Sequence, residues 1–416
     1  MEFVQRAPRS LGNSRFASVM KRCARTADNW LDRARRSVGA RPRPAVLFEV
    51  YNPFGFDAQE PVVHLLAERG LVDVYVSGGV ERGLAPHRIA ALTRAGVHVH
   101  ALRASRHRRF DAVVVTDGPL INSWRSSRHM FLHHGSGFGI DPSPYAFQML
   151  ESGEVDYLLA IHPTEALSAY ARFGRRLRGH MRVVGQPKLD RLVNATHSSR
   201  ALLESFGLDP ARRTILFLSH WTPTSLMHTW GEAILGTLRA RTEFNVLVTG
   251  HHHLWDHPAR SGGVDWRARL RWIGDEAHMR LFPQTEDLVG LMTAADVAIT
   301  DNTSGTLEYA LLYRPIVLFR HPDFAFSELE LDMLLRRTTS VFSHVNEFAA
   351  AFQQALRLES IDGIRRRELL DYCFSHVGDS SLRAAIAIEQ VATSGILTET
   401  VASTNVDGGA AVPSQR

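Results

Sequence analysis

The sequence predicts an α/β protein with two Rossmann-like, doubly wound domains that face a shared cleft. Its length of 416 residues exceeds what a single hydrophobic core usually holds. Short apolar runs alternate with helix-like segments, which is typical of parallel sheets covered on both faces. The alternation occurs twice, before and after a polar segment at residues 194–213, and this repetition predicts two domains.

The first series of elements occupies residues 45–195, the predicted N-terminal domain. Apolar runs predict its strands, and glycines end several helices between them. The predicted strands are residues 45–51, 71–76, 97–101, 111–116, 130–133, 156–161 and 182–184, and the predicted helices are residues 61–69, 87–94 and 164–173.

The second series occupies residues 210–372, the predicted C-terminal domain. Its predicted strands are residues 214–218, 244–249, 297–300 and 315–319, and its predicted helices include residues 229–241 and 306–313. The helical stretch 362–394 is expected to cap this half or to cross back to the first half, with a C-terminal helix at residues 373–395. Residues 396–416, rich in small and polar side chains, predict a disordered tail.

Residues 1–44 predict a basic helical extension. They hold eleven arginines and lysines but only three acidic residues, and apolar residues recur among them at roughly helical spacing. A basic amphipathic helix can lie on an anionic membrane surface; a solvated helix, or one packed on a neighbouring domain, is the alternative. No aromatic and basic platform or helix-turn-helix pattern follows, so nucleic acid is not an expected partner.

Composition excludes several other classes of protein. No apolar run reaches the roughly 18 residues of a membrane span, and no secretory signal is recognisable. We therefore expect a cytoplasmic location, at the inner face of the cell membrane if the basic helix binds there. The two cysteines, Cys23 and Cys373, have neither the number for a disulfide framework nor the spacing of a metal finger.

Two histidine-containing segments follow predicted strands, where ligands bind in doubly wound sheets. The glycines of the loop at residues 133–139 allow close approach of a phosphate or sugar, and a histidine there suits general-base chemistry. His251, His252 and His253 follow the strand at residues 244–249. Adjacent residues on an extended chain point to opposite faces, so we expect a histidine–phosphate contact and no metal site.

The loop at residues 301–305 follows a predicted strand and opens a helix. Hydroxyls and unpaired N–H groups at a helix start can bind an anion, with simple N-capping as the alternative. Asp301 would be repelled by a diphosphate and is expected to orient the loop. Trp221, after the strand at residues 214–218, is expected to line the cleft or to pack in the core. The residues expected to face the diphosphate are Thr303, Ser304 and Gly305.

These segments, in this order, resemble the CDP-glycerol glycerophosphotransferase family, enzymes of GT-B fold that prime and polymerise teichoic-acid-like chains. The most specific match is residues 295–304, then a helix and Arg314-Pro315, against the family pattern Ala-Asp-Val-Leu-Ile-Thr-Asp-Tyr-Ser-Ser and Arg-Pro. The resemblance covers about residues 125–390. Supporting matches are residues 133–137 (Trp-His-Gly-Thr-Pro in the family), 185–190 (Gly-Tyr-Pro-Arg-Asn-Asp), 219–222 (Pro-Thr-Trp-Arg), 248–252 and 378–383.

The resemblance implies roles for individual residues. His134 is the implied general base on the acceptor hydroxyl, and His251 or His252 would bind the donor phosphates and stabilise the leaving CMP. The implied phosphate contacts are Gly135, Ser136, Thr303, Ser304 and Gly305, and the implied supports of the nucleotide or its loop are Asp301, Glu308 and Trp221.

The resemblance also implies the partners of the site. They are a CDP-activated polyol donor and a lipid-linked or glycan hydroxyl acceptor, in cell-envelope polymer synthesis. No metal or other cofactor is implied, because positive dipoles and histidines can neutralise the phosphates. Two departures leave the transferred group open: a basic residue of the family falls at Gly139, and the arginine after its tryptophan falls at Thr222.

Two other functions fit the same sequence. A nucleotide-sugar glycosyltransferase or a UDP-N-acetylglucosamine 2-epimerase shares the architecture, and residues 303–305 with Glu308 look like the epimerases' Ser-Gly-Gly pattern with its downstream glutamate. The paired glutamates of the epimerases are missing, because Tyr309 follows Glu308. A non-catalytic nucleotide-binding protein with a degenerate cleft is the third alternative.

Overall fold

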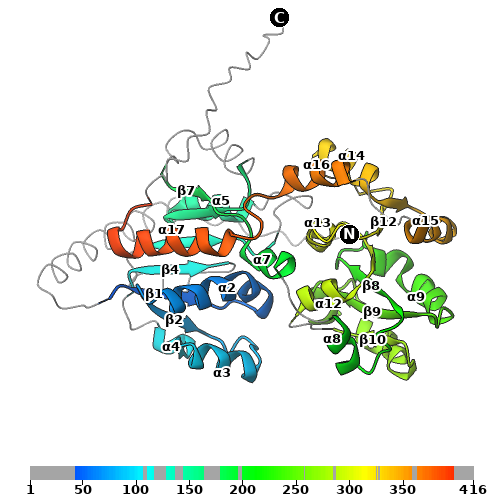
Figure 1. The fold of residues 1–416 in the computed structure, drawn as a ribbon, viewed down its shortest axis with the longest axis horizontal. Helices are drawn as coiled ribbons and strands as arrows, with labels where there is room; N and C mark the ends of the chain where they lie inside the picture. The colour runs from blue at the N-terminus through cyan, green and yellow to red at the C-terminus, as the bar shows by residue number, and fades with distance from the viewer. Residues whose placement is uncertain are drawn as a thin grey trace, which may run out of the picture.

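The structure, a computed structural model, describes most of the chain between residues 43 and 397 (Figure 1). Most of the predicted basic extension, the predicted helix 164–173 and nearly all of the predicted tail lie outside the described residues. The described ranges are residues 43–105, 110–116, 128–135, 144–163, 179–194, 199–256, 258–283, 287–324, 326, 328–357 and 363–397.

Two fully parallel sheets form the framework of the two halves. The first has the order β3-β2-β1-β4-β5-β6-β7, and the second has the order β10-β9-β8-β11-β12-β13. The strands of the first are β1 (Ala45–Glu49), β2 (Asp73–Ser77), β3 (His98–His100), β4 (Ala112–Val115), β5 (His129–Leu132), β6 (Tyr157–Ala160) and β7 (Met181–Val183). Those of the second are β8 (Arg213–Ser219), β9 (Phe244–Gly250), β10 (Met279–Leu281), β11 (Val297–Thr300), β12 (Ile316–Phe319) and β13 (Ser340–Phe342).

Helices connect the strands within each half. In the N-terminal half they are α2 (Pro53–Arg69), α3 (Pro86–Arg94), α4 (Leu102–Ser105), α5 (Pro144–Ser152) and α7 (Pro187–Val193). The C-terminal half has α8 (Ser199–Ser205), a π-helical turn (Met227–Gly231), α9 (Glu232–Arg239), α10 (His253–Asp256), α11 (Trp266–Arg269), a 3-10 turn (Arg271–Asp275), α12 (Leu288–Ala294), α13 (Ser304–Ala310), α14 (Leu329–Thr338), α15 (Val345–Arg357) and α16 (Gly363–Cys373), before α17 (Ser380–Ser394).

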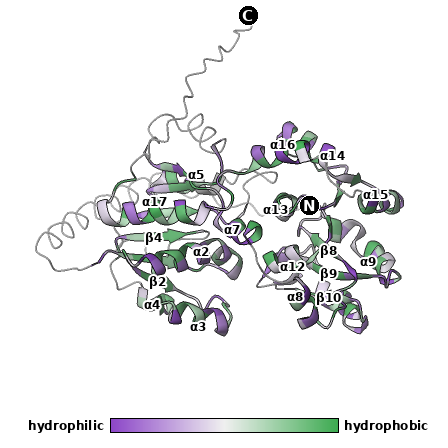
Figure 2. Ribbon diagram, in the orientation of Figure 1, coloured by the Kyte–Doolittle hydropathy of each residue, from purple (hydrophilic) through white to green (hydrophobic). Residues whose placement is uncertain are grey.

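The strands are buried on both faces, as their near-continuous apolar sequences predict. In β1, Val46 and Phe48 belong to one apolar cluster and Leu47 belongs to another on the opposite face. Figure 2 shows mainly hydrophobic residues on β4 and hydrophilic residues on outer helices such as α3 and α16. In each sheet the strand order reverses beside its first strand, β1 or β8, where ligands bind in doubly wound folds.

The C-terminal helix α17 crosses back to the N-terminal half (Figure 1). Ala384, Ile388 and Val391 are buried in the same apolar cluster as residues of β1 and α2. Arg69 at the end of α2 donates to Glu389 over 2.8 Å. The stretch 362–394 was expected to cap the C-terminal half or to cross back to the N-terminal half. The structure shows both: α16 packs on the C-terminal half, and α17 crosses back to the N-terminal half.

Two of the family-like segments, residues 185–190 and 378–383, stabilise this crossover. Asp190 in α7 accepts hydrogen bonds from the backbone N–H groups of Gly378 (2.9 Å) and Ser381 (2.7 Å), at the start of α17. Gly185 has a φ of +85°, and a Cβ there would overlap the Ser380 hydroxyl. The segments 185–190 and 378–383 therefore meet in space and hold the C-terminal helix against α7.

Several elements differ from the predictions. Helix α2 begins at Pro53 and not at residue 61, because Asn52 caps it and Pro61 lies inside it without ending it. The predicted linker at residues 194–213 contains α8, as its helical sequence predicts, whereas the predicted helix 229–241 begins as a π-helical turn. The edge strands β10 and β13 were not predicted, since three residues carry too little periodicity to recognise.

Candidate active site

A cavity of about 760 Å³ lies at the carboxyl ends of the strands, with walls from both halves. The N-terminal half contributes segments that follow β1, β2 and β5 and part of α7, and the C-terminal half contributes segments that follow β8, β9 and β11. The cavity thus occupies the position that doubly wound sheets give to ligands.

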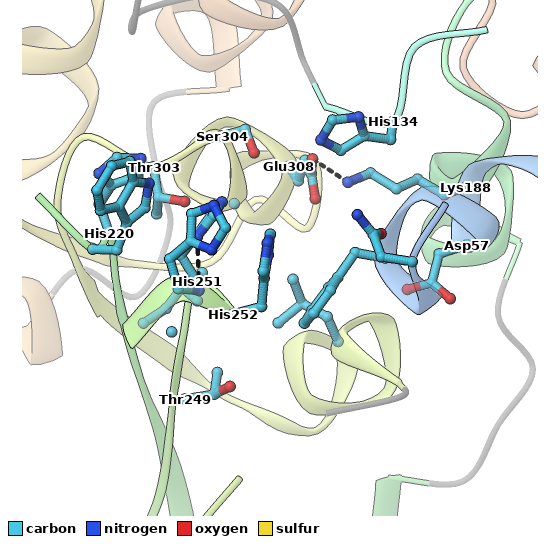
Figure 3. A pocket seen from close by; sticks show the side chains of 18 of the residues that line it. Asp57, His134, Lys188, His220, Thr249, His251, His252, Thr303, Ser304 and Glu308 are labelled. Atoms are coloured by element: carbon cyan, nitrogen blue, oxygen red, sulfur yellow. Dashed lines mark hydrogen bonds and ion pairs between the residues drawn. The ribbon is translucent and has the colours of Figure 1, made fainter. Parts of the chain in front are cut away.

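Most of the sequence-predicted site residues line this cavity (Figure 3). Gly135 lies beside it, since a Cβ at this glycine would come within 3.9 Å of Ser304 Oγ. Asp301 is buried, and Ser136 lies outside the described residues. Those that line the cavity are His134, Trp221, His251, His252, Thr303, Ser304, Gly305 and Glu308.

Asp301 ties the loop after β11 to the loop after β8. Its carboxylate accepts hydrogen bonds from the Ser219 hydroxyl (2.7 Å) and from the backbone N–H groups of His220 (2.9 Å) and Leu226 (2.7 Å). Complete burial raises the pKa of Asp301 to about 6, although these donors favour the ionised form. The carboxylate therefore organises the loops and does not line the cavity.

Two histidines of the cavity wall present N–H groups while neutral. The backbone N–H of His253 donates to Nδ1 of His251 (3.2 Å), and the backbone N–H of Thr222 donates to Nδ1 of His220 (3.3 Å). In each neutral ring the proton then resides on Nε2. Burial lowers the pKa of His220 to about 4, and burial with neighbouring histidines lowers the pKa of His251, so both rings are neutral near pH 7.

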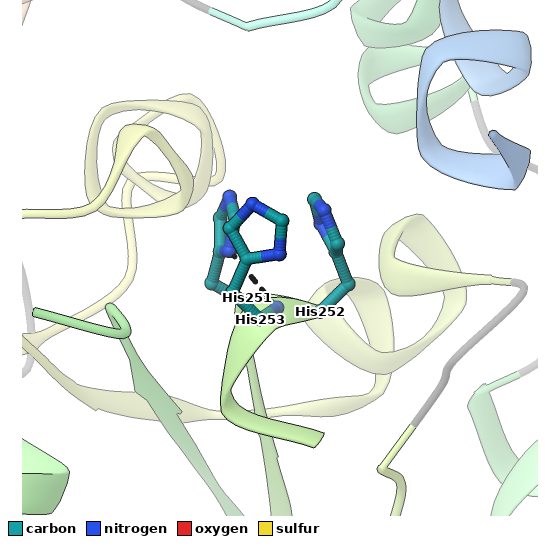
Figure 4. A group of neighbouring side chains, drawn as sticks. All are labelled: His251, His252 and His253. Carbon is teal, nitrogen blue, oxygen red and sulfur yellow. Dashed lines mark hydrogen bonds between the residues drawn. The ribbon is translucent and has the colours of Figure 1, made fainter. Parts of the chain in front are cut away.

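The consecutive histidines His251, His252 and His253 cluster more closely than expected (Figure 4). Each offers a ring nitrogen within 4.8 Å of the others, because the chain turns after Gly250 into α10. A metal ion needs a ring nitrogen with a free lone pair. As hydrogen-bonded, His251 has one nitrogen occupied as an acceptor and the other protonated, so this cluster fits an anion better than a cation.

The start of α13 forms the floor of the cavity. Thr303 precedes the helix, and its side chain makes no capping hydrogen bond. The Thr306 hydroxyl donates to the backbone carbonyl of Asp301 (2.6 Å) and so stabilises the turn between β11 and α13. A Cβ at Gly305 would overlap a methyl group of Leu218, so a larger residue there would force this side chain to move.

Sequence reasoning missed an ion pair that joins the two halves across the cavity. Lys188 Nζ in α7 lies 2.6 Å from Glu308 Oε1 in α13, and both side chains are largely buried (Figure 3). Lys188 lies in the family-like segment 185–190, and this segment was the feature of the sequence that could have identified it as a site residue. Asp57, His220 and Arg82 also line the cavity and were not chosen as site residues.

Trp221 was expected either to line the cleft or to pack in the core, and the structure shows it doing both. It packs against the apolar cluster of the C-terminal half and also lines the cavity. Its ring lies 5.2 Å from that of His253 in an edge-on contact. The indole therefore contacts the histidine cluster and also contributes surface to the cavity.

Comparison with a family model gives a match over more than half of the chain. The model, described as CDP-Glycerol:Poly(glycerophosphate) glycerophosphotransferase, matches residues 101–329. A curated UDP-N-acetylglucosamine--N-acetylmuramyl-(pentapeptide) pyrophosphoryl-undecaprenol N-acetylglucosamine transferase from Phocaeicola vulgatus is 24% identical over 196 residues, 45% of this chain and 47% of that protein. This second match spans about half the length of the curated relative.

Solved structures share the fold. Two structures of the wall teichoic acid polymerase TagF give TM-scores of 0.56 and 0.57 at 15% and 13% identity, cover 91% and 92% of this chain, and are themselves 98% covered. A UDP-N-acetylglucosamine 2-epimerase homologue from Listeria monocytogenes gives 0.53 at 12% identity, over 84% of this chain and 96% of that one. The predicted two-domain GT-B architecture is confirmed.

The burial of Asp301 predicts a specific dependence of stability on pH. The folded protein holds this proton up to about pH 6, whereas the ordinary pKa is 3.8. The contribution of Asp301 to stability is therefore fully present below about pH 4 and is lost as the pH rises through about 6. Relative to Asp301→Asn, the wild-type free energy of unfolding should fall by about 2 kcal/mol between pH 4 and 7 in urea titrations.

Asp323→Asn is the matched control, because the Asp323 carboxylate is exposed. Its stability should follow the wild-type curve across the same range. Parallel curves for wild type and Asp301→Asn would contradict the assignment of a shifted, buried carboxyl.

Proposed function

The chain belongs to the CDP-glycerol:poly(glycerophosphate) glycerophosphotransferase family, and we propose that it transfers a glycerophosphate-type group from a CDP-activated donor to a hydroxyl acceptor in cell-envelope polymer synthesis. The observation that carries this proposal is the cavity in which His134 of one half faces His251, Thr303 and Ser304 of the other. A base and a set of anion-binding donors meet there, as a phosphoryl transfer requires.

The donor diphosphate would lie on the cavity floor. The hydroxyls of Thr303 and Ser304 can donate to its oxygens, and the neutral rings of His220 and His251 can each donate an Nε2–H. Neutral donors suit this place, because they stabilise charge without the cost of burying several cations. His252 would complete the phosphate contacts from the same loop.

The transfer step uses His134 as the base. Its ring accepts the proton of the acceptor hydroxyl while the oxygen attacks the donor phosphorus that bears glycerol. A phosphorus–oxygen bond forms to the acceptor, and the bond to the bridging oxygen of CMP breaks. CMP leaves with the bridging electron pair, and N–H groups such as that of His251 stabilise its charge.

Glu308 and Trp221 would support the nucleoside. Glu308 is almost fully buried at the cavity edge, and one of its carboxylate oxygens lies beside Lys188. A carboxylate can accept hydrogen bonds from the two ribose hydroxyls, while Lys188 limits its repulsion of the phosphates. Asp301 would act indirectly, by holding the floor loop in place.

The acceptor side is the lipid-linked or glycan hydroxyl expected from the family. We propose that residues 1–44 bring the enzyme to the anionic inner surface of the membrane, on the basis of their charge and helical spacing. No helix among the described residues is long and apolar enough to span a bilayer. Equal flotation of the full chain and a variant lacking residues 1–40 with anionic liposomes would remove this part of the proposal.

A nucleotide screen tests the donor. CDP should raise the melting temperature more than UDP or GDP at equal concentration, because the family uses CDP-glycerol and the ligand that binds more tightly stabilises the fold more. Differential scanning fluorimetry measures the shifts. A larger shift with UDP would favour a nucleotide-sugar enzyme instead, a function compatible with the fold that the chain shares with the epimerase homologue.

Replacement of the base tests the reaction. His134→Gln should lower kcat by about 100-fold to 10,000-fold while the affinity for CDP is unchanged, because the base acts on the acceptor and not on the nucleotide. His344→Gln, an exposed histidine far along the chain, is the control and should keep wild-type kcat. If CDP binds and wild type transfers nothing from any donor, the non-catalytic alternative is favoured.

A further inference from the structure

Among the described residues, two arginines line the cavity without a carboxylate partner. The cavity's other cations among the described residues, Lys188 and Arg191, each form an ion pair with a carboxylate of the opposite half. Within the same described part of the chain, Arg82 and Arg260 form no such pair. A cationic side chain left uncompensated beside a cavity is suited to an anionic ligand.

Arg82 belongs to the N-terminal half and follows β2. Its guanidinium lies over the ring of Tyr51, 5.4 Å from the ring centre, and both residues line the cavity. The buried Nε of Arg82 has no hydrogen-bond partner among the described residues. This cation–π contact leaves the N–H groups of the guanidinium available to a phosphate.

Arg260 belongs to the C-terminal half, in the turn between α10 and α11. One of its terminal nitrogens lies 3.4 Å from Nδ1 of His253, whose ring contacts Trp221 edge-on at 5.2 Å. Arg260 therefore places a positive charge beside His253 and its neighbour Trp221.

Ring contacts between the two halves involve residues near both arginines. Phe54, close to Tyr51 in sequence, stacks on His252 of the opposite half at 5.1 Å. The ring of His252 lies 4.1 Å from that of His253, which Arg260 approaches. Arg82 and Arg260 thus line the same cavity from opposite halves, together with Thr303 and Ser304.

We propose that Arg82 and Arg260 form a second anion site, which binds a phosphodiester of the acceptor. This inference rests on the proposed function, since the donor diphosphate already occupies the floor at Thr303 and Ser304. An acceptor that carries a glycerophosphate unit presents a second phosphate near its terminal hydroxyl. Arginine recognises phosphate through paired N–H groups, so the site selects acceptors that are already primed with phosphate.

Calorimetry with a small probe tests the site. sn-Glycerol 3-phosphate is titrated into wild type, Arg82→Gln, Arg260→Gln and the double variant, each saturated with CDP. Each single change should weaken binding of the probe roughly tenfold or more, because each removes a charged hydrogen bond to phosphate. CDP affinity should be unchanged in all four proteins, since the floor is intact.

The control is the double variant Arg94→Gln and Arg271→Gln, which removes the same charge from exposed positions outside the cavity. It should bind the probe as wild type does. Activity provides a second measurement: the preference for glycerol 3-phosphate over glycerol as acceptor, taken as the ratio of kcat/KM values, should fall in the Arg82 and Arg260 variants only.

Three results would decide against the second anion site: unchanged probe affinity in the double variant, an equal loss in the control, or a parallel loss of CDP affinity, which would assign both arginines to the donor. The proposed function fails separately. If wild type transfers nothing from CDP-glycerol and probe binding still depends on both arginines, the transferase proposal falls and the anion site stands.

Discussion

The buried carboxylate of Asp301 is the interaction on which the geometry of the cavity depends. It holds the end of β11 against the segment after β8 through one hydroxyl and two backbone N–H groups. The floor at Thr303 and Ser304 and the ring of His220 are therefore positioned by one group. Burial penalises the ionised form of this group, and its hydrogen bonds offset only part of that cost, whereas loss of the side chain would leave several donors without acceptors.

The relation between the two halves depends on contacts distant in sequence. Helix α17 returns to the N-terminal half, where Asp190 binds its first turn, and Lys188 of the same helix α7 reaches Glu308 in the opposite half. Helix α7 thus connects the C-terminal crossover to the cavity. Because His134 and the proposed phosphate-binding floor come from different halves, their spacing depends on these contacts, and this links the fold directly to the proposed chemistry.

Sequence reasoning found the residues that follow strands and missed those positioned by contacts between distant segments. The alternation of apolar runs predicted both sheets, and the strand-end rule selected His134, His251 and Thr303, which the structure brings to one cavity. Arg82 and Arg260 lie outside the recognised motifs, and only the folded chain brings them to the same cavity. The Nε2–H form of His251 depends on a backbone donor in the next turn, which composition and spacing do not reveal.

The central claim is that the site transfers a phosphoryl-linked polyol and not a sugar. The two reactions break different bonds of the donor, so the released nucleotide distinguishes them. Phosphorus-31 NMR of the wild-type enzyme with CDP-glycerol and a glycerol phosphate acceptor reads this product directly. The account predicts one CMP released for each phosphodiester formed; release of CDP, or turnover with UDP-sugars alone, would contradict it.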